Sequence, residues 1–382
     1  MAGVCELSFP RSHLNQGNEP KQTETKNIMK EGTIKLMADI TSFYSHLVGQ
    51  ENAIKQRVNA WTAYVLGAHP KSAFVKGEAG LGKTALMRAD AKCAKWCMEQ
   101  RGEFGEVLYY KSAGELRKNG EDWKRFITTV LDSSTGSTFI YLDEFHELLP
   151  LLVQGAKVIQ LLKGWTDKER GEFRSVSFGD EGTATRHASQ IMFIVGTNFP
   201  AKIPDYQAIA SRLGEIDLEL YSIPQLCEIA VRMAKNAKLQ IVENTVGTLA
   251  RCGRGTARPI EKIIEKASEL ALIHDKRTIS KADALEIMRE NSLYPHGLKT
   301  LEVAMINEAQ KGYISLATVA TAQKVETKVV KDAACFLNYI GMIAINGAKF
   351  TASQEGRDFI SAIKKLKFHV PEFKREEQEA SA

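Results

Sequence analysis

The stretch GEAGLGKT, residues 77–84, decides how the rest of the chain is interpreted. It fits the pattern G-x-x-x-x-G-K-[S/T] and lies between a short apolar segment, SAFVKG (72–77), and a segment with the apolar spacing of a helix. In such a loop the glycines allow backbone N–H groups to turn toward a phosphate at the positive end of a helix. We therefore expect Lys83 to contact the β- and γ-phosphates of a nucleotide and the Thr84 hydroxyl to bind Mg²⁺.

The alternative interpretation of this loop is a glycine-rich turn with a solvated lysine. The predicted strand before it and the predicted helix after it make that alternative the weaker one. We expect the whole loop to contact ATP, through Gly77, Glu78, Ala79, Gly80, Leu81, Gly82, Lys83 and Thr84.

Two further apolar segments end in polar side chains of the kind that phosphate chemistry requires. STFIYLDE (137–144) ends in Asp143 and Glu144, and a parallel strand would deliver both beside the phosphates. We expect Asp143 to bind Mg²⁺, partly through water, and Glu144 to orient and deprotonate the attacking water. QIMFIVGTN (190–198) ends in Asn198, which would position that water or contact the γ-phosphate. The alternatives are carboxylates exposed at a strand end and, for Asn198, an ordinary turn residue.

Length and composition limit the number of domains and the classes of partner that this chain can have. A chain of 382 residues is too long for one compact core, so two or three domains are expected. A net charge of +5 permits nucleic acid or another anion as partner but does not require one. The six cysteines form no C-x-x-C pair, which favours separate thiols in a reducing cytoplasm over a metal site at Cys93 and Cys97. We expect no membrane contact, because no apolar run approaches the ~20 residues of a membrane span.

The order of the expected elements predicts the fold class. Up to residue 222, strands alternate with helices, which indicates an α/β unit with a parallel sheet covered on both faces. From Ile223 only helices follow, and the last part ends in a hairpin with Asn-Gly at its tip, typical of a winged helix. The expected units are a flexible leader (1–37), a large ATPase domain (38–222), a small helical lid (223–294), a winged-helix DNA-binding domain (295–366) and a flexible tail (367–382).

With these segments in order, the chain resembles the RuvB family of AAA+ ATPases, the bacterial Holliday-junction branch-migration motors, from about residue 40 to 360. The resemblance is carried by LVGQENAIKQ, GEAGLGKT, LDEFHEL, ASRLGEIDLELYSIPQL and RGTARPIEKII, and by the winged-helix pattern of HGLKTLEVAMI…FTAS (296–353). It implies that Arg258 is the sensor 2 residue, reaching from the lid to the γ-phosphate. It also implies that Arg212 is an arginine finger entering the neighbouring subunit's site, which requires a ring, most simply a homo-hexamer. Val48 would line the nucleotide pocket.

The chain departs from the family's pattern at several positions. Ala210 stands where the family usually has an arginine, Asn198 where it has threonine, and Glu78 where it has proline. Glu147 replaces a basic residue, and the wing carries one lysine, Lys349, where the family's wing is rich in arginine. The nucleotide residues therefore transfer more securely than the Holliday-junction substrate. For Arg212 and Arg258 the alternative is a surface ion pair.

The resemblance also implies partner surfaces. Duplex or junction DNA would meet lysines of the winged-helix region and the segment after it: Lys299, Lys311, Lys324, Lys328, Lys331, Lys364, Lys365 and Lys367. The alternative for each of these lysines is a solvated helix face. The expected hairpin at 172–187 corresponds to the element that docks on RuvA, the junction-binding protein. There Phe173, Val176 and Phe178 would either contact a RuvA-like partner or pack on the sheet.

Three functions are consistent with these features. The leading hypothesis is an ATP-driven DNA helicase or translocase of RuvB type. The second is a non-translocating AAA+ assembly, such as a replication initiator, loader or transposition regulator, that uses ATP as an assembly switch. The third, a ring that remodels proteins, is the weakest, because the sequence shows no aromatic-glycine pore loop of the usual unfoldase kind.

Overall fold

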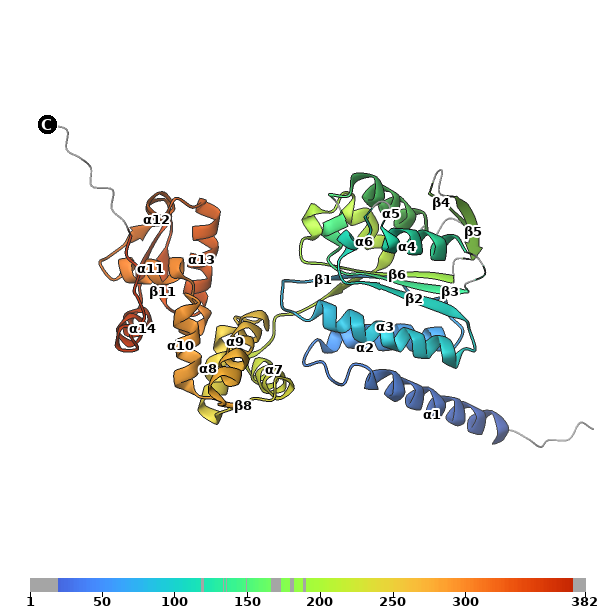
Figure 1. Cartoon of the computed structure of the whole chain (residues 1–382), viewed down its shortest axis with the longest axis horizontal. Coiled ribbons are helices and arrows are strands. Elements are labelled where there is room, and N and C mark those ends of the chain that lie inside the picture. The colour runs from blue at the N-terminus through green and yellow to red at the C-terminus, as the bar shows by residue number, and fades with distance from the viewer. Residues whose placement is uncertain are drawn as a thin grey trace, which may run out of the picture.

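A computed structural model describes residues 20–117, 120–132, 134, 136–148, 150–165, 173–178, 182–187 and 190–373. In Figure 1 a sheet with helices above and below it is joined through the extended segment after β7 to a group of helices, which leads to the C-terminal unit. The residues expected to form the first part of the leader (1–19) and the end of the tail (374–382) lie outside the described residues.

The first unit is built on a five-stranded parallel sheet with the order β2-β3-β6-β1-β7. Its strands are β1 (Ala73–Lys76), β2 (Gly105–Tyr110), β3 (Ser137–Leu142), β6 (Ile191–Thr197) and β7 (Glu215–Asp217). Every residue of β3 and β6 is buried, as expected for runs of β-branched and aromatic residues in a sheet covered on both faces. This confirms the predicted α/β class. β7 was not among the expected strands and has only three residues.

Helices cover both faces of this sheet (Figure 1). α2 (Glu51–Val65) and α3 (Lys83–Gln100) lie on one face; α4 (Glu121–Leu131), α5 (Leu152–Trp165) and α6 (Tyr206–Leu213) lie on the other. Alternation along β3 separates the two cores: Phe139 and Tyr141 pack with the α2 and α3 side, whereas Ile140 and Leu142 pack with the opposite side. The sheet is thus fixed between two independent apolar layers.

One buried carboxylate fastens α3, the helix that follows the phosphate-loop motif, to its surroundings. Asp90 is 1% exposed and accepts hydrogen bonds from the Tyr44 hydroxyl (2.5 Å), the Trp61 indole (2.8 Å) and the Tyr141 hydroxyl (2.8 Å). The Arg57 guanidinium donates to both of its oxygens, at 2.8 and 3.0 Å. Burial, together with the Asp90 charge, raises the pKa of Tyr44 and of Tyr141, so both remain neutral donors.

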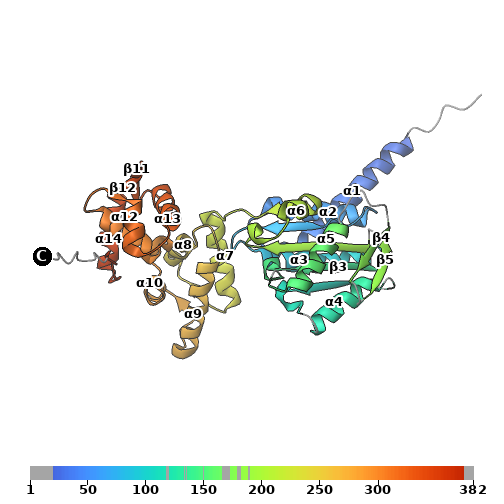
Figure 2. The ribbon, with the colours of Figure 1, turned by 90° about the horizontal axis from the view of Figure 1, so that it is seen from above.

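The N-terminal segment differs from the expectation. α1 (Pro20–Ser42) is helical through much of the predicted leader and extends away from the α/β unit (Figure 2). Leu36, Met37 and Ile40 lie at helical spacing and pack on the core that contains α2 and α3. Residues 20–37 of the expected leader are therefore part of a helix whose short apolar stripe packs against the domain, and flexibility of the leader stays a prediction.

The helical lid follows β7 in the chain. It contains α7 (Ile223–Asn236), α8 (Glu243–Cys252), α9 (Arg258–His274) and α10 (Lys281–Glu290), with β8 (Gln240–Ile241) paired to β9 (Thr278–Ile279). α7 begins with a capping box: the Gln225 side chain accepts from the Ser222 backbone N–H at 2.9 Å, and the Ser222 hydroxyl accepts from the Gln225 N–H at 3.4 Å. Chain entry into the lid is therefore fixed by local hydrogen bonds.

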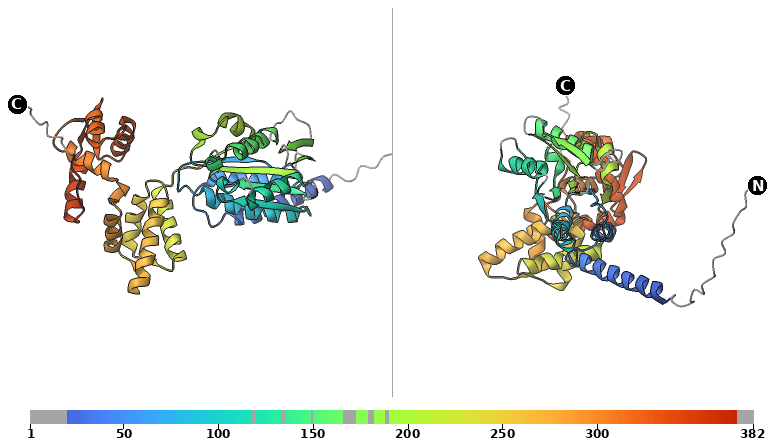
Figure 3. Two further views of the ribbon diagram at one scale, coloured as in Figure 1. Left: turned by 45° about the horizontal axis from the view of Figure 1, so that its top comes forward. Right: turned by 90° about the vertical axis from the view of Figure 1, so that its right-hand side faces the viewer.

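The last unit has the predicted winged-helix arrangement (Figure 3). It contains α11 (Thr300–Ala309), β10 (Ile314–Ser315), α12 (Leu316–Gln323), α13 (Thr327–Tyr339), β11 (Ile343–Asn346), β12 (Lys349–Ala352) and α14 (Gln354–Lys365). β11 and β12 form the antiparallel wing, and β10 adds to β12 as a third strand. One continuous hydrophobic core joins this unit to the lid, so the two are packed together.

The expected hairpin is present as β4 (Phe173–Ser177) and β5 (Thr183–His187). Phe178 is 1% exposed and its ring contacts those of Trp123 and Phe126, so it packs on the domain and is not available to a partner. Phe173 is 67% exposed. The buried Arg186 fixes the hairpin by donating to the carbonyls of Thr129 and Val130 in the last turn of α4. The Val176 side chain lies outside the described residues.

None of the helices in the described part of the chain is long and apolar enough to cross a membrane.

Candidate functional site

The phosphate-loop motif forms the tight connection between β1 and α3. Gly80 and Gly82 have φ angles of 86° and 89°, in the left-handed region that favours glycine. A Cβ on Gly82 would lie 2.7 Å from the Tyr221 hydroxyl, and one on Gly80 would lie 2.9 Å from Cβ of Arg258. Both glycines are therefore required by backbone conformation and by close neighbours.

Lys83 begins α3 and lies across this loop. Its ammonium donates to the carbonyls of Gly77 and Glu78, both at 2.7 Å. Burial lowers the pKa of Lys83, while the nearby carboxylates of Glu144, Asp143 and Glu78 act in the opposite direction. The lysine is thus placed between the loop backbone and the acidic residues, where a phosphate chain would require a cation.

Thr84 and Asp143 form the second contact between the loop and the sheet. The Thr84 hydroxyl donates to Oδ2 of Asp143 at 2.6 Å, and the Tyr109 hydroxyl donates to the same oxygen at 3.5 Å. Asp143 is 1% exposed and follows the last residue of β3. A hydroxyl and a carboxylate are the hard oxygen ligands that Mg²⁺ prefers, so the residues present fit this ion.

Glu144 is held by the neighbouring strand. It adopts a φ of 46°, and the Asn198 side-chain amide, just beyond β6, donates to both of its carboxylate oxygens at 3.1 Å. His146 Nδ1 lies 3.4 Å from the same carboxylate and 3.3 Å from the Thr197 hydroxyl. Oδ1 of Asn198 is buried and has no hydrogen-bond partner among the described residues, which leaves it as an unused acceptor.

The lid contacts the phosphate loop directly. The backbone N–H of Ala257 donates to the Gly80 carbonyl at 2.9 Å, which places the first residue of α9, Arg258, against the loop. The Tyr221 hydroxyl and the Gln50 side chain donate to the Leu81 carbonyl at 2.7 and 3.3 Å. The exposed side chain of Arg258 thus starts beside the loop, as the expected role requires.

Val48 lies at the same junction. It is partly buried and packs against the lid core, as does Tyr221. The sequence analysis placed Val48 in the nucleotide pocket but missed Gln50 and Tyr221, although both lie in segments that carried the resemblance. Both side chains donate to the Leu81 carbonyl, which is 31 positions from Gln50 and 140 positions from Tyr221. No local sequence pattern marks contacts over such separations.

Arg212 is not part of this cluster. It lies exposed near the end of α6, and its guanidinium donates to the Ala208 carbonyl of its own helix at 2.9 Å. Within the described residues, no hydrogen bond or ion pair connects it to the phosphate loop, Asp143 or Glu144.

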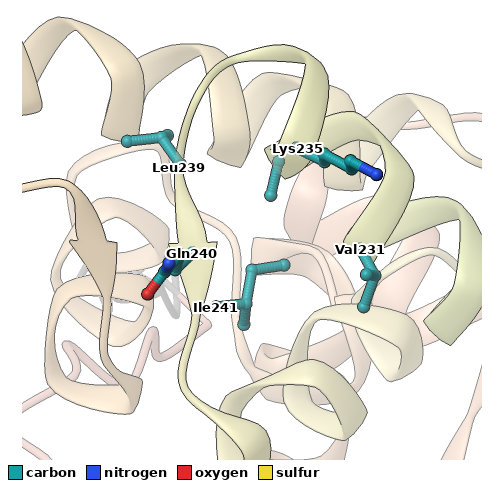
Figure 4. Close-up of a pocket in the computed structure, with 6 residues that line it drawn as sticks. Val231, Lys235, Leu239, Gln240 and Ile241 are labelled. Atoms are coloured by element: carbon teal, nitrogen blue, oxygen red, sulfur yellow. The ribbon is translucent and has the colours of Figure 1, made fainter.

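A separate hollow on the lid is not included in the candidate site. It is lined by Val231, Ala234, Lys235, Leu239, Gln240 and Ile241, which belong to α7, β8 and the turn between them; all but Ala234 are labelled in Figure 4. It contains none of the residues that gather at the phosphate loop.

Comparison with known proteins gives relatives along most of the chain, although no protein-family model matches it. The Holliday junction branch migration complex subunit RuvB of Anaeromyxobacter sp. (strain Fw109-5) is 23% identical over 300 residues, which cover 76% of this chain and 80% of that protein. RuvB of Treponema denticola is 24% identical over 241 residues, or 63% of this chain and 64% of that protein.

Solved structures give the same likeness. A variant of Thermotoga maritima RuvB superposes with a TM-score of 0.54 at 20% identity, covering 85% of this chain and 97% of that one. The structure described as the Thermotoga maritima RuvB Holliday junction branch migration motor gives a TM-score of 0.50 at 18% identity over 85% and 96% of the two chains. At these identities the likeness shows the fold.

Gly80 offers a direct test of the contact between loop and lid. Gly80→Ala should weaken the binding of ATP about fivefold or more, because the added Cβ would meet Arg258 and because hydrogen-bonded contacts of this kind are worth about 1 kcal/mol or more each. Gly102→Ala is the matched control, since Gly102 also has a positive φ, 64°, but has no neighbour within 4 Å of an added Cβ. Equilibrium titration with a fluorescent ATP analogue measures both. Equal affinities in the two variants would contradict the contact.

Proposed function

Since the chain is a distant relative of RuvB with the AAA+ fold, we propose that it is an ATP-hydrolysing, ring-forming DNA motor that drives branch migration or translocation on duplex DNA. The observation that carries this proposal is the meeting of three strand ends at one place. β1 leads into the phosphate loop, β3 delivers Asp143 and Glu144, and β6 delivers Asn198. A DNA substrate and the unpaired cysteines among the described residues fit an expected location in the cytoplasm.

The residues divide the work of ATP hydrolysis among them. Lys83 and the loop N–H groups bind the phosphates, and Thr84 with Asp143 would hold Mg²⁺. When bound, that ion neutralises charge on the phosphoryl oxygens. Glu144 accepts the proton of the attacking water, and the Asn198 amide keeps its carboxylate aimed at the site.

Two arginines complete the site in this proposal. Arg258 reaches the γ-phosphate of its own protomer, because α9 starts against the loop. Arg212 acts on the neighbouring protomer's nucleotide, because it is exposed on α6 and makes no contact with its own site among the residues that the structure describes. A finger that works across an interface requires a closed ring, for which we propose a homo-hexamer.

The winged-helix unit is the proposed DNA-binding surface. Lys328 and Lys331 are exposed on α13, and Lys349 is exposed on the wing. Lysines contact phosphates without reading sequence, as a motor that moves along DNA requires. For a RuvA-like partner the β4–β5 hairpin offers Phe173 as an exposed aromatic group, whereas Phe178 is buried within the domain.

A non-translocating, DNA-binding AAA+ assembly is the second candidate. The wing favours it, because Lys349 is the sole charged residue between Ile343 and Ala352, which gives weaker phosphate contacts than an arginine-rich wing. In that case ATP would act as an assembly switch, and ATPase activity would not be accompanied by unwinding.

A four-way-junction assay separates the two candidates. The wild-type protein should dissociate a labelled four-way junction with ATP, and DNA should stimulate its ATPase. Glu144→Gln should bind ATP yet lose both activities by at least about 10²-fold, since it lacks the general base. Glu147→Gln, in the same turn but contacting Ser112, is the control and should remain active. ATPase activity without junction dissociation would support the assembly switch instead.

The finger assignment predicts complementation between two inactive variants. Arg212→Ala should bind ATP but hydrolyse it on the order of 10³-fold more slowly, and Lys83→Met should fail to bind ATP. Mixed rings should regain activity, because the intact Arg212 of a Lys83→Met protomer enters the intact site of an Arg212→Ala protomer. Gln207→Ala, an exposed change on the same helix, is the control for α6. A mixture that stays inactive while forming rings would show that Arg212 does not act in trans.

A further inference from the structure

The segment 253–258 leads into the lid helix α9 and is hydrogen-bonded to the phosphate loop. Its Ala257 N–H donates to the Gly80 carbonyl at 2.9 Å, and the Gly255 carbonyl accepts from the Tyr221 N–H at 2.8 Å. Tyr221 in turn donates through its hydroxyl to the Leu81 carbonyl at 2.7 Å. One end of this short segment is therefore fixed to the backbone of the nucleotide site.

The other end of the segment is fixed to the winged-helix unit through Arg254. Nη1 of Arg254 lies 2.9 and 3.0 Å from the two carboxylate oxygens of Glu302 on α11. The same carboxylate accepts the Lys299 N–H at 2.8 Å and is 3% exposed. The guanidinium carbon of Arg254 lies 3.5 Å from the ring centre of Phe336 on α13. One arginine thus contacts both the first helix of the winged-helix unit and the helix that bears Lys328 and Lys331.

These contacts are specific to an arginine. Its planar group can stack on an aromatic face and pair with a carboxylate at once, which a lysine ammonium cannot do. A carboxylate as buried as Glu302 requires a charged partner, and Arg254 supplies it. The absence of a side chain at Gly297 makes space for Arg254, since a Cβ there would lie 2.8 Å from Cγ of Arg254. The chain thus shapes a dedicated place for this side chain.

We propose that Arg254 is a positioning residue that couples the ATP site to the DNA-binding helix. Arg254 lies four residues before Arg258, in a segment whose ends are held by the phosphate loop and by α11. A shift of the loop that accompanies the gain or loss of the γ-phosphate therefore moves Arg254, and Arg254 moves α11 and α13 with it. The shared core of the lid and the winged-helix unit carries that displacement as one body.

The coupling rests on the proposed function, in which the ligands at the two ends are ATP and duplex DNA. It is reciprocal: if ATP changes the affinity for DNA by some factor, DNA changes the affinity for ATP by the same factor. A purely structural ion pair would contribute to stability and leave that factor unchanged.

The test measures the coupling factor. Duplex DNA affinity is measured by fluorescence anisotropy with full-length protein in the presence of ATPγS and of ADP. The wild-type protein should show a ratio of about fivefold or more between the two states, as is typical of coupled sites. Arg254→Met should bring that ratio close to one while binding ATPγS as wild type does. Arg251→Met is the matched control and should keep the ratio, because the exposed Arg251 donates to Gly247 of its own helix.

A second measurement does not depend on DNA. Hydrogen exchange of α11 and α13 should differ between the ATPγS and ADP states of the wild type and of Arg251→Met, and should not differ in Arg254→Met. If Arg254→Met does not fold, Arg254→Lys takes its place, since it keeps a charge opposite Glu302 but cannot stack on Phe336; it should show a reduced difference.

The outcomes separate the two proposals. A folded Arg254 variant that keeps the wild-type anisotropy ratio and exchange difference overturns the coupling and leaves the proposed function intact. A wild-type protein that does not bind DNA overturns the proposed function, and the exchange difference then decides the coupling alone. A wild-type protein whose α11 and α13 do not respond to nucleotide overturns the coupling.

Discussion

The parallel order of β3, β6 and β1 is the constraint on which the nucleotide site depends. Because the three strands are neighbours and run in one direction, their carboxyl ends meet at one edge of the sheet. The direction and order of the strands are sufficient to bring together the phosphate loop, the two acidic residues after β3, and Asn198 after β6. The apolar layers on the two faces keep this edge in place, and the buried Asp90 ties α3 to β3 and to α2.

The second constraint is the close approach of the lid to that edge. Carbonyls of the phosphate loop are hydrogen-bonded by Ala257 and Tyr221, so the loop's backbone is shared between two units of the chain. In the proposed function, a nucleotide at this loop would contact groups from the sheet and from the start of α9 together. The same segment continues to Arg254 and the winged-helix unit. In the coupling that we propose, this segment passes the nucleotide state to a lid and a winged-helix unit that share one hydrophobic core.

Local sequence patterns were sufficient for the parts of the fold that repeat along the chain. The glycine pattern at 77–84 and the apolar runs ending in Asp143 and Asn198 predicted which residues lie together at the candidate site, because each lies at the end of its own element. β7 was missed because three residues are too few to show a period. The sequence did not show which side of the β4–β5 hairpin packs on the domain. Alternation places Phe173 and Phe178 on opposite sides but does not indicate which side is covered. The Arg254–Glu302 contact joins residues 48 positions apart, and no local pattern marks such a pair.

The central claim is that sheet and lid hold the terminal phosphate jointly. The most direct measurement is a pair of equilibrium titrations, with ATPγS and with ADP, of the wild-type protein and of Arg258→Ala. The account predicts that the variant binds ADP as the wild type does but binds ATPγS about 10- to 100-fold more weakly, the value of a charge-assisted hydrogen bond to the γ-phosphate. A wild-type protein that binds neither nucleotide, or a variant with unchanged affinity for ATPγS, would contradict it.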